Sequence, residues 1–184
     1  MTSVMLDLET WGTAPGSALR SIGACTFVPA TGETPQTFYR NITRASCEAV
    51  GLVVDPETVK WWSDQSPEAR AALEPDQQPL TTVLLDFFKW WGAVGGETIW
   101  SHGANFDEVL LKSAIAAVML EAPWDFWNVR CCRTVLALGN RRPLRTGVHH
   151  NALDDAIAQR VLQLVVFLVA VALEDRVAEA RLQE

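Results

Sequence analysis

Short apolar runs in the first third of the chain are separated by turn-forming residues, a pattern typical of β-strands. The turn segments are WGTAPGS, between the first and second runs, and PATGET, between the second and third. The sequence therefore predicts three strands in an antiparallel meander, over residues 3–9, 21–28 and 36–42.

From Asp55 onward the pattern becomes helical. Asp55 and Ser66 each precede a proline, as expected at an N-cap and the first helical position, and Pro123 is expected to end a later helix. The predicted elements are helices over 55–62, 66–73, 79–91, 105–122 and 151–173 and a short strand over 97–103. This order indicates an α/β fold, a mixed β-sheet flanked by α-helices, in a single domain over residues 1–184.

A chain of 184 residues with 49% apolar and 20% charged residues can form a full hydrophobic core without cross-links. The four cysteines show no CxxC spacing, so we expect neither a disulfide framework nor a zinc knuckle, and a cytoplasmic location. The first residues carry no targeting pattern, and the longest apolar run, over 164–173, is far shorter than the ~20 residues of a membrane span. We therefore expect no membrane contact.

The net charge of −7 argues against a protein that coats nucleic acid through bulk electrostatics. Basic residues are nevertheless concentrated just before the HHNALDD segment. Such a stretch either contacts phosphates or forms a solvated loop. The arginines concerned are Arg130, Arg133, Arg141, Arg142 and Arg145.

Two acidic residues interrupt the apolar character of the first predicted strand. Asp7 and Glu9 are two positions apart, so their side chains point to the same face of a strand. Burying an unpaired carboxylate costs several kcal/mol, and no adjacent Arg or Lys offers a partner, whereas a bound cation supplies the missing charge. The alternative is that the strand ends at Leu6 and both acids face water.

Further acidic residues lie at the starts of two predicted helices. Asp107 follows a strand, where α/β sheets open their clefts, although an acid in a first turn also complements the helix dipole. In HHNALDDA, Asn151 is a natural N-cap and Asp154 fits the return partner of a capping box. Asp155 is left without such a role, and His150 lies on the loop beside it.

Carboxylates and a histidine at these positions suit one kind of chemistry. Asp7, Glu9, Asp107 and Asp155 can hold a pair of divalent cations roughly 3.5 to 4 Å apart, the arrangement used for in-line displacement at phosphorus. Oxygen ligands select Mg²⁺ or Mn²⁺ over Zn²⁺. Histidine titrates near neutral pH, so His150 can accept a proton from the attacking water.

The segments MLDLET, WSHGANFD and HHNALDDA, in this order and spacing, resemble the three exonuclease motifs of the DEDDh 3′-to-5′ exonucleases, which include ribonuclease T and polymerase proofreading subunits. The segments TVKWWSDQSPEAR and PWDFWNVRCCRT resemble a phage and prophage exoribonuclease-like branch. The resemblance implies a ribonuclease H-like fold, a two-metal site and His150 as the general base. The carboxylates that it implies as metal ligands are Asp7, Glu9, Asp107 and Asp155.

The assignment of the histidine has one alternative, because His149 and Asp154 have the same offset as His150 and Asp155. The later pair is preferred, since the capping box accounts for Asp154 and the family pattern commonly places the second histidine of HHxALDDA in the catalytic role. His102 has no general role in that pattern, so we expect it to pack or to lie at the edge of the substrate.

Aromatic residues offer surfaces on which bases stack, and Trp11, just past Glu9, is the candidate closest to the metal site in sequence. In the helical pairs Trp61/Trp62 and Trp90/Trp91, neighbouring side chains point about 100° apart. One of each pair is then expected in the core, and the other is available to the substrate or to a homodimer interface. The candidate substrate contacts are Leu8, Thr10, Trp11, Phe106, Arg133, Arg141 and Arg142.

We therefore expect a metal-dependent 3′-to-5′ exonuclease that releases nucleoside 5′-monophosphates from single-stranded RNA or DNA in a bacterial or phage-infected cell. The rivals are a structure-selective endonuclease or ribonuclease H-type enzyme on the same fold, and a non-catalytic nucleic-acid-binding or phage assembly module. His150 favours the exonuclease, and the complete ligand set argues against the module. RNA and DNA both stay open, because the sequence does not reveal a partner for the 2′-hydroxyl.

Overall fold

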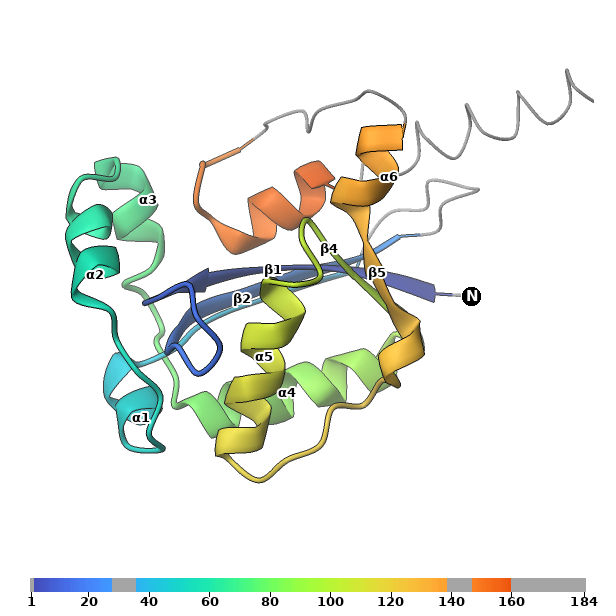
Figure 1. The fold of residues 1–184 in the computed structure, drawn as a ribbon, viewed down its shortest axis with the longest axis horizontal. Coiled ribbons are helices and arrows are strands. Elements are labelled where there is room, and N and C mark those ends of the chain that lie inside the picture. The colour runs from blue at the N-terminus through green and yellow to red at the C-terminus, as the bar shows by residue number, and fades with distance from the viewer. Residues whose placement is uncertain (1, 28–35, 139–146, 160–184) are drawn as a thin grey trace, which may run out of the picture.

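A five-stranded sheet forms the centre of the computed structural model, which describes residues 2–27, 36–138 and 147–159 (Figure 1). The strands are β1 (Thr2–Thr10), β2 (Leu19–Phe27), β3 (Thr37–Asn41), β4 (Gly96–Ser101) and β5 (Val129–Cys131). Their order across the sheet is β3-β2-β1-β4-β5. β1 pairs antiparallel with β2, and β2 with β3, whereas β4 is parallel to both β1 and β5. The predicted meander and mixed sheet are confirmed.

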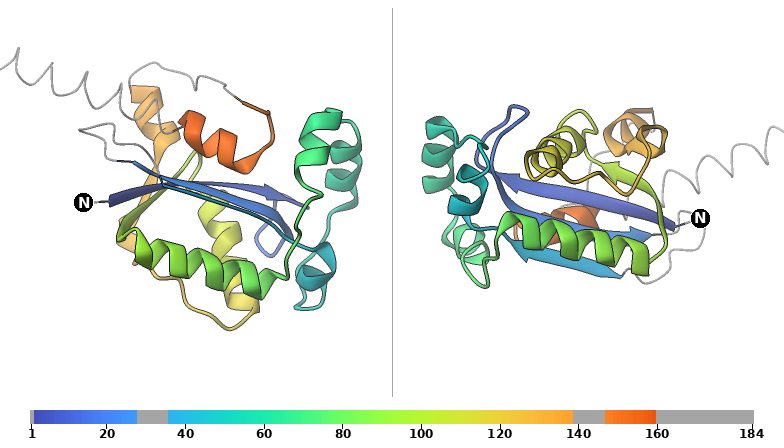
Figure 2. Two further views of the ribbon diagram at one scale, coloured as in Figure 1. Left: turned by 180° about the vertical axis from the view of Figure 1, so that it is seen from behind. Right: turned by 90° about the horizontal axis from the view of Figure 1, so that it is seen from below.

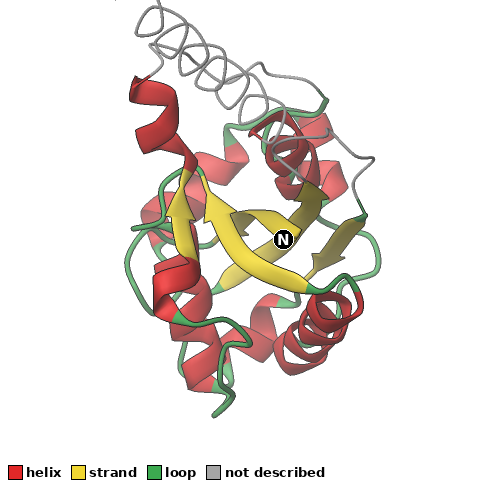
Figure 3. Cartoon of the chain, turned by 90° about the vertical axis from the view of Figure 1, so that its right-hand side faces the viewer, coloured by secondary structure: helices red, strands yellow, loops and turns green. Residues whose placement is uncertain are grey.

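Helices cover both faces of this sheet. They are α1 (Arg44–Glu48), α2 (Pro56–Ser63), α3 (Pro67–Ala72), α4 (Leu80–Ala93), α5 (Asp107–Ala117), the 3-10 turn η1 (Phe126–Asn128), α6 (Cys132–Leu138) and a helix over 152–159. α4 and α5 lie against one face, while α6 and the helix over 152–159 lie against the other (Figures 1 and 2). Figure 3 shows the strands in the middle of this arrangement.

Alternation along β1 sends its side chains into different layers. Leu6 and Leu8 are buried in the larger hydrophobic core, on the side of α4 and α5. Met5 points the opposite way, into a smaller core that includes residues of α6 and of the helix over 152–159. Asp7 and Glu9 share the face of Met5, because side chains of a strand repeat every second residue.

Capping side chains begin the two helices beyond the carboxyl end of β1 (Figure 1). The Asp55 carboxylate accepts hydrogen bonds from the Glu57 backbone N–H at 3.0 Å and from the Thr58 hydroxyl at 2.9 Å. Ser66 Oγ accepts one from the Ala69 backbone N–H at 3.1 Å. Both N-caps are confirmed, and they stabilise the first turns of α2 and α3.

The predicted end of α5 is wrong, because the helix stops before position 122 and before the proline expected to end it. Met119 adopts a left-handed conformation with φ of 57°. Its backbone N–H donates to the Ala116 carbonyl at 3.0 Å, and that of Leu120 donates to the Ile115 carbonyl at 3.1 Å. These two hydrogen bonds form a Schellman closure with methionine where glycine is usual.

The interpretation of the arginine-rich stretch as a solvated loop is wrong for its first part. Residues 129–131 add strand β5 to the sheet, and 132–138 form α6, whose Cys132 and Leu136 are buried in the smaller core. α1 had no counterpart in the predicted elements. The terminal helix is confirmed over 152–159, and its predicted continuation, with the apolar run over 164–173, lies outside the described residues.

Within the part of the chain that the structure describes, no helix is long and apolar enough to cross a membrane.

Candidate active site

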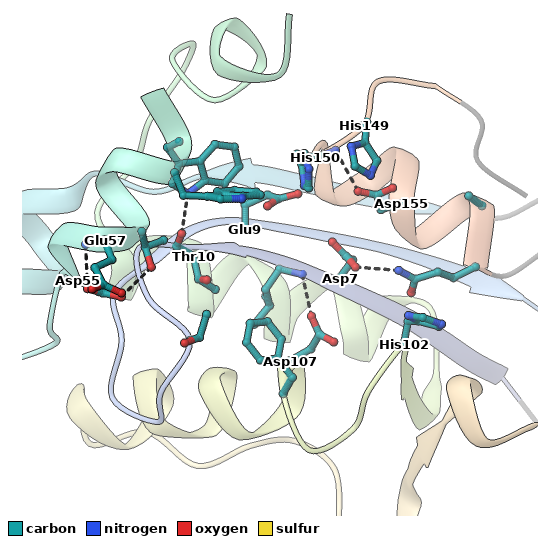
Figure 4. Close-up of a pocket in the computed structure, with 18 residues that line it drawn as sticks. Asp7, Glu9, Thr10, Asp55, Glu57, His102, Asp107, His149, His150 and Asp155 are labelled. Carbon is teal, nitrogen blue, oxygen red and sulfur yellow. Dashed lines mark hydrogen bonds between the residues drawn. The ribbon is translucent and has the colours of Figure 1, made fainter. Parts of the chain in front are cut away.

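A cavity of about 680 Å³ opens on the face of β1 that carries its acidic residues (Figure 4). Its walls come from the end of β1, from α2, from the start of α5 and from the loop and helix at the end of the described chain. Asp7, Glu9, Asp107, His150 and Asp155 all line it. The structure therefore brings together the five residues that the sequence proposed for metal binding and proton transfer.

β1 supplies two of the carboxylates from positions well inside the strand. Glu9 is buried, with 7% of its surface exposed, and the strand continues to Thr10, so the alternative in which it ends at Leu6 is wrong. Asp7 Oδ1 accepts a hydrogen bond from Gln159 Nε2 at 2.8 Å, which ties β1 to the helix over 152–159. Sequence reasoning missed Gln159, because it lies at the far end of the chain from Asp7 and carries no motif.

Asp107 reaches the same place through the parallel pairing of β4 with β1. Because β4 runs in the same direction as β1, its carboxyl end delivers the start of α5 beside the carboxyl end of β1. Asp107 Oδ1 accepts a hydrogen bond from the Leu8 backbone N–H at 3.2 Å, and its side chain is buried. This contact places the Asp107 carboxylate beside Asp7 and Glu9, the neighbours of Leu8 in β1.

A glycine allows the helix over 152–159 to rest directly on the sheet. Gly23 of β2 pairs with Asp7, and a Cβ at Gly23 would lie 2.2 Å from the carbonyl carbon of Ala152 and from the Leu153 nitrogen. No side chain fits at that distance, so a residue without a Cβ is required. This close approach brings Asp155, in the first turn of that helix, over β1.

Asp154 and Asp155 accept hydrogen bonds from different backbone N–H groups of the preceding loop. Asn151 Oδ1 accepts from the backbone N–H groups of Leu153 at 3.1 Å and Asp154 at 3.2 Å, so the predicted N-cap is confirmed. Asp154 does not close a capping box on Asn151, because its Oδ2 accepts from the Val148 backbone N–H at 2.8 Å. Asp155 Oδ2 accepts from the His150 backbone N–H at 3.2 Å, on the cavity side (Figure 4).

Three of the cavity residues form a compact ligand set. One ligand atom each of Glu9, His150 and Asp155 lies within 4.8 Å of the others. His149 lines the cavity too, and its ring centroid is 3.8 Å from that of His150. The alternative pairing of His149 with Asp154 is disfavoured by this geometry, because Asp155, and not Asp154, is among the described residues that line the cavity.

The electrostatics of the site indicate a missing positive charge. Burial, together with the carboxylates of Asp107, Glu9 and Asp155, raises the pKa of Asp7 well above its usual range. Burial and the Asp155 carboxylate raise the pKa of Glu9 to about 8, and burial raises that of Asp107 to about 7. Acids held together in this way repel one another when ionised, and a divalent cation removes the repulsion. The residues present therefore fit a divalent cation.

The candidate substrate contacts are divided between the cavity and its surroundings. Leu8, Thr10 and Phe106 line the cavity. Trp11 is not among its described lining residues and instead packs against the Arg20 guanidinium, 4.2 Å from the ring centroid. Arg141 and Arg142 lie outside the described residues.

Arg133 and Arg130 do not form one basic patch in the described chain. Arg133 Nη2 donates a hydrogen bond at 2.8 Å to the carbonyl of His102, a residue that lines the cavity. Burial and the Arg133 charge lower the pKa of His102, and its expected place at the edge of the substrate stays a prediction. Arg130 lines a second cavity of about 310 Å³ together with Glu97 and Trp124.

Sequence reasoning missed two further cavity residues as site residues, Trp61 and Trp62 on α2. Trp61 is 43% exposed and Trp62 3% exposed, which confirms the predicted split of the pair. The available signal was their helical spacing, which distinguishes the inner ring from the outer one but does not show what the outer ring contacts.

Comparisons with known proteins place the sequence in a family. The family model described as the 3′-5′ exoribonuclease Rv2179c-like domain matches residues 2–167. Among curated proteins, an exodeoxyribonuclease of Enterobacteria phage T4 is 25% identical over 221 residues, covering 97% of this chain and 95% of that protein.

Solved structures share the fold at low sequence identity. The nuclease domain of 3′hExo, a DEDDh family member bound to rAMP, superposes with a TM-score of 0.57 at 13% identity, covering 92% of each chain. E. coli exonuclease I in complex with a dT13 oligonucleotide gives a TM-score of 0.62 at 15% identity, covering 95% of this chain and 43% of that one. The chain thus spans less than half of exonuclease I. These likenesses confirm the predicted ribonuclease H-like fold.

Proposed function

Because the chain belongs to the Rv2179c-like 3′-5′ exoribonuclease domain family and is a 3′-to-5′ exonuclease, we propose that it shortens single-stranded RNA or DNA from the 3′ end. Each turnover releases one nucleoside 5′-monophosphate. The observation that carries the proposal is the convergence of four carboxylates and His150 on one cavity, from segments at opposite ends of the chain.

The carboxylates of Asp7, Glu9, Asp107 and Asp155 are the proposed ligands of two divalent cations, Mg²⁺ or Mn²⁺. The support is their oxygen chemistry and the raised pKa values of Asp7, Glu9 and Asp107, which mark a cluster short of positive charge. When bound, such cations polarise the scissile phosphate and neutralise its developing charge.

His150 is the proposed general base. Its ring lies at the cavity, and one of its nitrogens is within 4.8 Å of carboxylate oxygens of Glu9 and Asp155. The imidazole accepts a proton as the oxygen of a water molecule forms its bond to phosphorus. The bond between phosphorus and the 3′-oxygen of the shortened strand breaks, and that oxygen takes up a proton from solvent.

The size of the cavity supports an unpaired end as the substrate. Its volume of about 680 Å³ falls within the roughly 300–1,000 Å³ of sites that enclose a small molecule, so it suits one nucleotide better than a base pair. Leu8 and Phe106 offer apolar surface to the base. The Thr10 hydroxyl donates to the Gly12 carbonyl at 2.8 Å, so its oxygen can only accept a hydrogen bond from the sugar. Arg133, beside His102 at the edge, is the proposed contact for a phosphate of the strand.

The deciding experiment uses single-stranded RNA and DNA of one sequence, each labelled at the 5′ end, with Mg²⁺, Mn²⁺ or chelator. Both sugars are needed because the family is described as exoribonucleases, whereas the phage relative is an exodeoxyribonuclease. The expected product is a ladder that shortens from the 3′ end and disappears with chelator. Internal cuts would support the endonuclease instead, and no hydrolysis with Mn²⁺ would support the non-catalytic module.

Two variants test the assignment of the base. His150→Ala should lower turnover by about 10²- to 10⁴-fold, the usual contribution of a positioned proton acceptor. His149→Ala should change it far less. The reverse order of effects would reassign the role to His149. The homodimer and the cytoplasmic location stay predictions, which sedimentation equilibrium and cell fractionation test.

A further inference from the structure

The His150 imidazole is in contact with aromatic rings. It lies in a loop, with a left-handed backbone φ of 63°. The Trp61 ring meets its imidazole edge to face, with centroids 4.8 Å apart and planes at 84°. Trp62 approaches at 5.9 Å and 77°. The ring of its neighbour His149 is closer still, with centroids 3.8 Å apart, but it belongs to the same loop. Because His150 lies outside the described helices and strands, the direction of its ring relative to β1 depends on contacts with other elements, and both tryptophans come from α2.

The inner tryptophan is itself firmly held. Trp62 is buried, and its Nε1 donates a hydrogen bond at 2.8 Å to the carbonyl of Thr10, the residue after Glu9 in β1. The Arg20 guanidinium lies 4.4 Å from the Trp62 ring centroid and 4.2 Å from that of Trp11. Trp62 therefore has a fixed position relative to the strand that carries the carboxylates.

Arg20 packs behind Trp62 as a buried charged side chain. Its side chain is 6% exposed and contacts Glu74 Oε1 at 3.3 Å through Nη2. Its Nε and Nη1 have no hydrogen-bond partner among the described residues. Besides its ion pair with Glu74 and the nearby charge of Glu9, Arg20 thus lies against two indole rings, and stacking on aromatic faces is a recognised role of the planar guanidinium.

The outer tryptophan is exposed in a way that core packing does not explain. Trp61 keeps 43% of its surface open while lining the cavity and contacting both Trp62 and His150. Its centroid is 5.0 Å from that of Trp62, in an edge-on contact. The Asp55 cap fixes the start of the helix that carries both rings.

We propose that Trp61 and Trp62 are positioning residues, which hold the His150 imidazole toward the Glu9 and Asp155 carboxylates. Arg20 stabilises this aromatic seat, which consists of Trp61 and Trp62, from behind. The inference rests on the proposed function of His150. It assigns the segment between the first two motif regions a task in catalysis, because neither tryptophan belongs to the motifs that supply the carboxylates.

A double-mutant cycle between Trp61 and His150 tests the proposal, with kcat and KM measured on a short single-stranded oligonucleotide in Mn²⁺. Trp61→Leu should lower kcat by about 10- to 100-fold, as expected when a reacting group is misplaced by about 1 Å, with little change in KM. In the His150→Ala background the same substitution should change kcat by less than about 2-fold, since the group it positions is gone. Trp61→Phe, which keeps a ring at this place, should retain most of the activity.

The matched control is Trp127→Leu, because Trp127 is 59% exposed and lies outside the cavity lining among the described residues. Its kcat should equal that of the wild type. Trp61→Gln is a second variant without the ring, in which the exposed position becomes polar. Melting curves establish that each variant is folded.

Three results would overturn the proposal in different ways. If Trp61→Leu raises KM at constant kcat, Trp61 serves the substrate. If it lowers kcat equally with and without His150, Trp61 serves the fold. Either result refutes the aromatic seat and leaves the general base in place. If His150→Ala itself keeps the wild-type kcat, the general base is refuted and the seat with it.

Discussion

A single methyl group placed on Gly23 should lower the turnover of the enzyme about 100-fold without unfolding it. In Gly23→Ala the new Cβ would lie 2.2 Å from backbone atoms of Ala152 and Leu153, where ordinary contact begins at 3.4 Å. The start of the helix over 152–159 must therefore retreat by about 1.2 Å, the difference between these two distances. Asp155, one turn further on, retreats with it, away from Asp7 on the strand paired with Gly23.

Both consequences of this retreat can be estimated. Overpacking of this kind costs about 1–3 kcal/mol, which leaves a typical domain folded at 25 °C and lowers the melting temperature by roughly 2–12 °C at this size. A misplacement of about 1 Å in a catalytic site costs on the order of 10²-fold in rate. We therefore expect turnover to fall about 100-fold at a temperature where the variant is fully folded.

The assay is turnover of an end-labelled single strand at saturating concentration, combined with a thermal melt. Gly92→Ala is the matched control, because Gly92 lies in α4 with no atom within 4 Å of an added Cβ. It should raise stability by roughly 0.5–1 kcal/mol and leave turnover unchanged. A Gly23→Ala enzyme with wild-type turnover and melting temperature would refute the reasoning.

Three further predictions concern the carboxylates. Asp7→Asn and Asp107→Asn should each abolish hydrolysis and reduce the stabilisation by Mn²⁺ seen in thermal melts, and an active Asp7→Asn enzyme would contradict the two-ion site. With chelator, the free energy of unfolding should fall as the pH rises from about 4.5 to about 8, because the pKa of Glu9 is raised in the folded state. Mn²⁺ should remove this fall in pH-dependent melts. A flat profile with chelator would contradict the prediction. Asp154→Ala removes the acceptor of the Val148 backbone N–H, so it should cost about 0.5–1.5 kcal/mol of stability by denaturant titration and little activity, whereas loss of turnover would move the metal ligand to that position.

Local patterns were sufficient for most of the fold. The acids of β1 stand out because their neighbours are apolar, and the Asp55 and Ser66 caps mark helices whose first turns they bond directly. The end of α5 could not be predicted, because Met119 occupies the left-handed position that glycine usually fills. The sequence therefore contains no glycine signal for the end of this helix.

The carboxylates and His150 could be placed in one site because their three segments together resemble the motifs of one exonuclease family. What supports them could not be predicted, because it depends on contacts between distant segments. Gly23 reads as an ordinary strand glycine until the helix over 152–159 is set against it, and Gln159 reads as a polar residue on a helix until it reaches Asp7. Periodicity likewise gave Trp61 an outward direction without identifying the ring it meets there.

The hydrogen bond between Asp7 and Gln159 joins residues 152 positions apart, so the site closes only when both ends of the domain have been made. At the roughly 5–20 residues per second of protein synthesis, Gln159 follows Asp7 by about 8 to 30 seconds. During that interval the nascent chain carries the acids of β1 without Asp155, its helix or His150. We therefore expect the nascent chain to be inactive as a nuclease until its last carboxylate has emerged and docked.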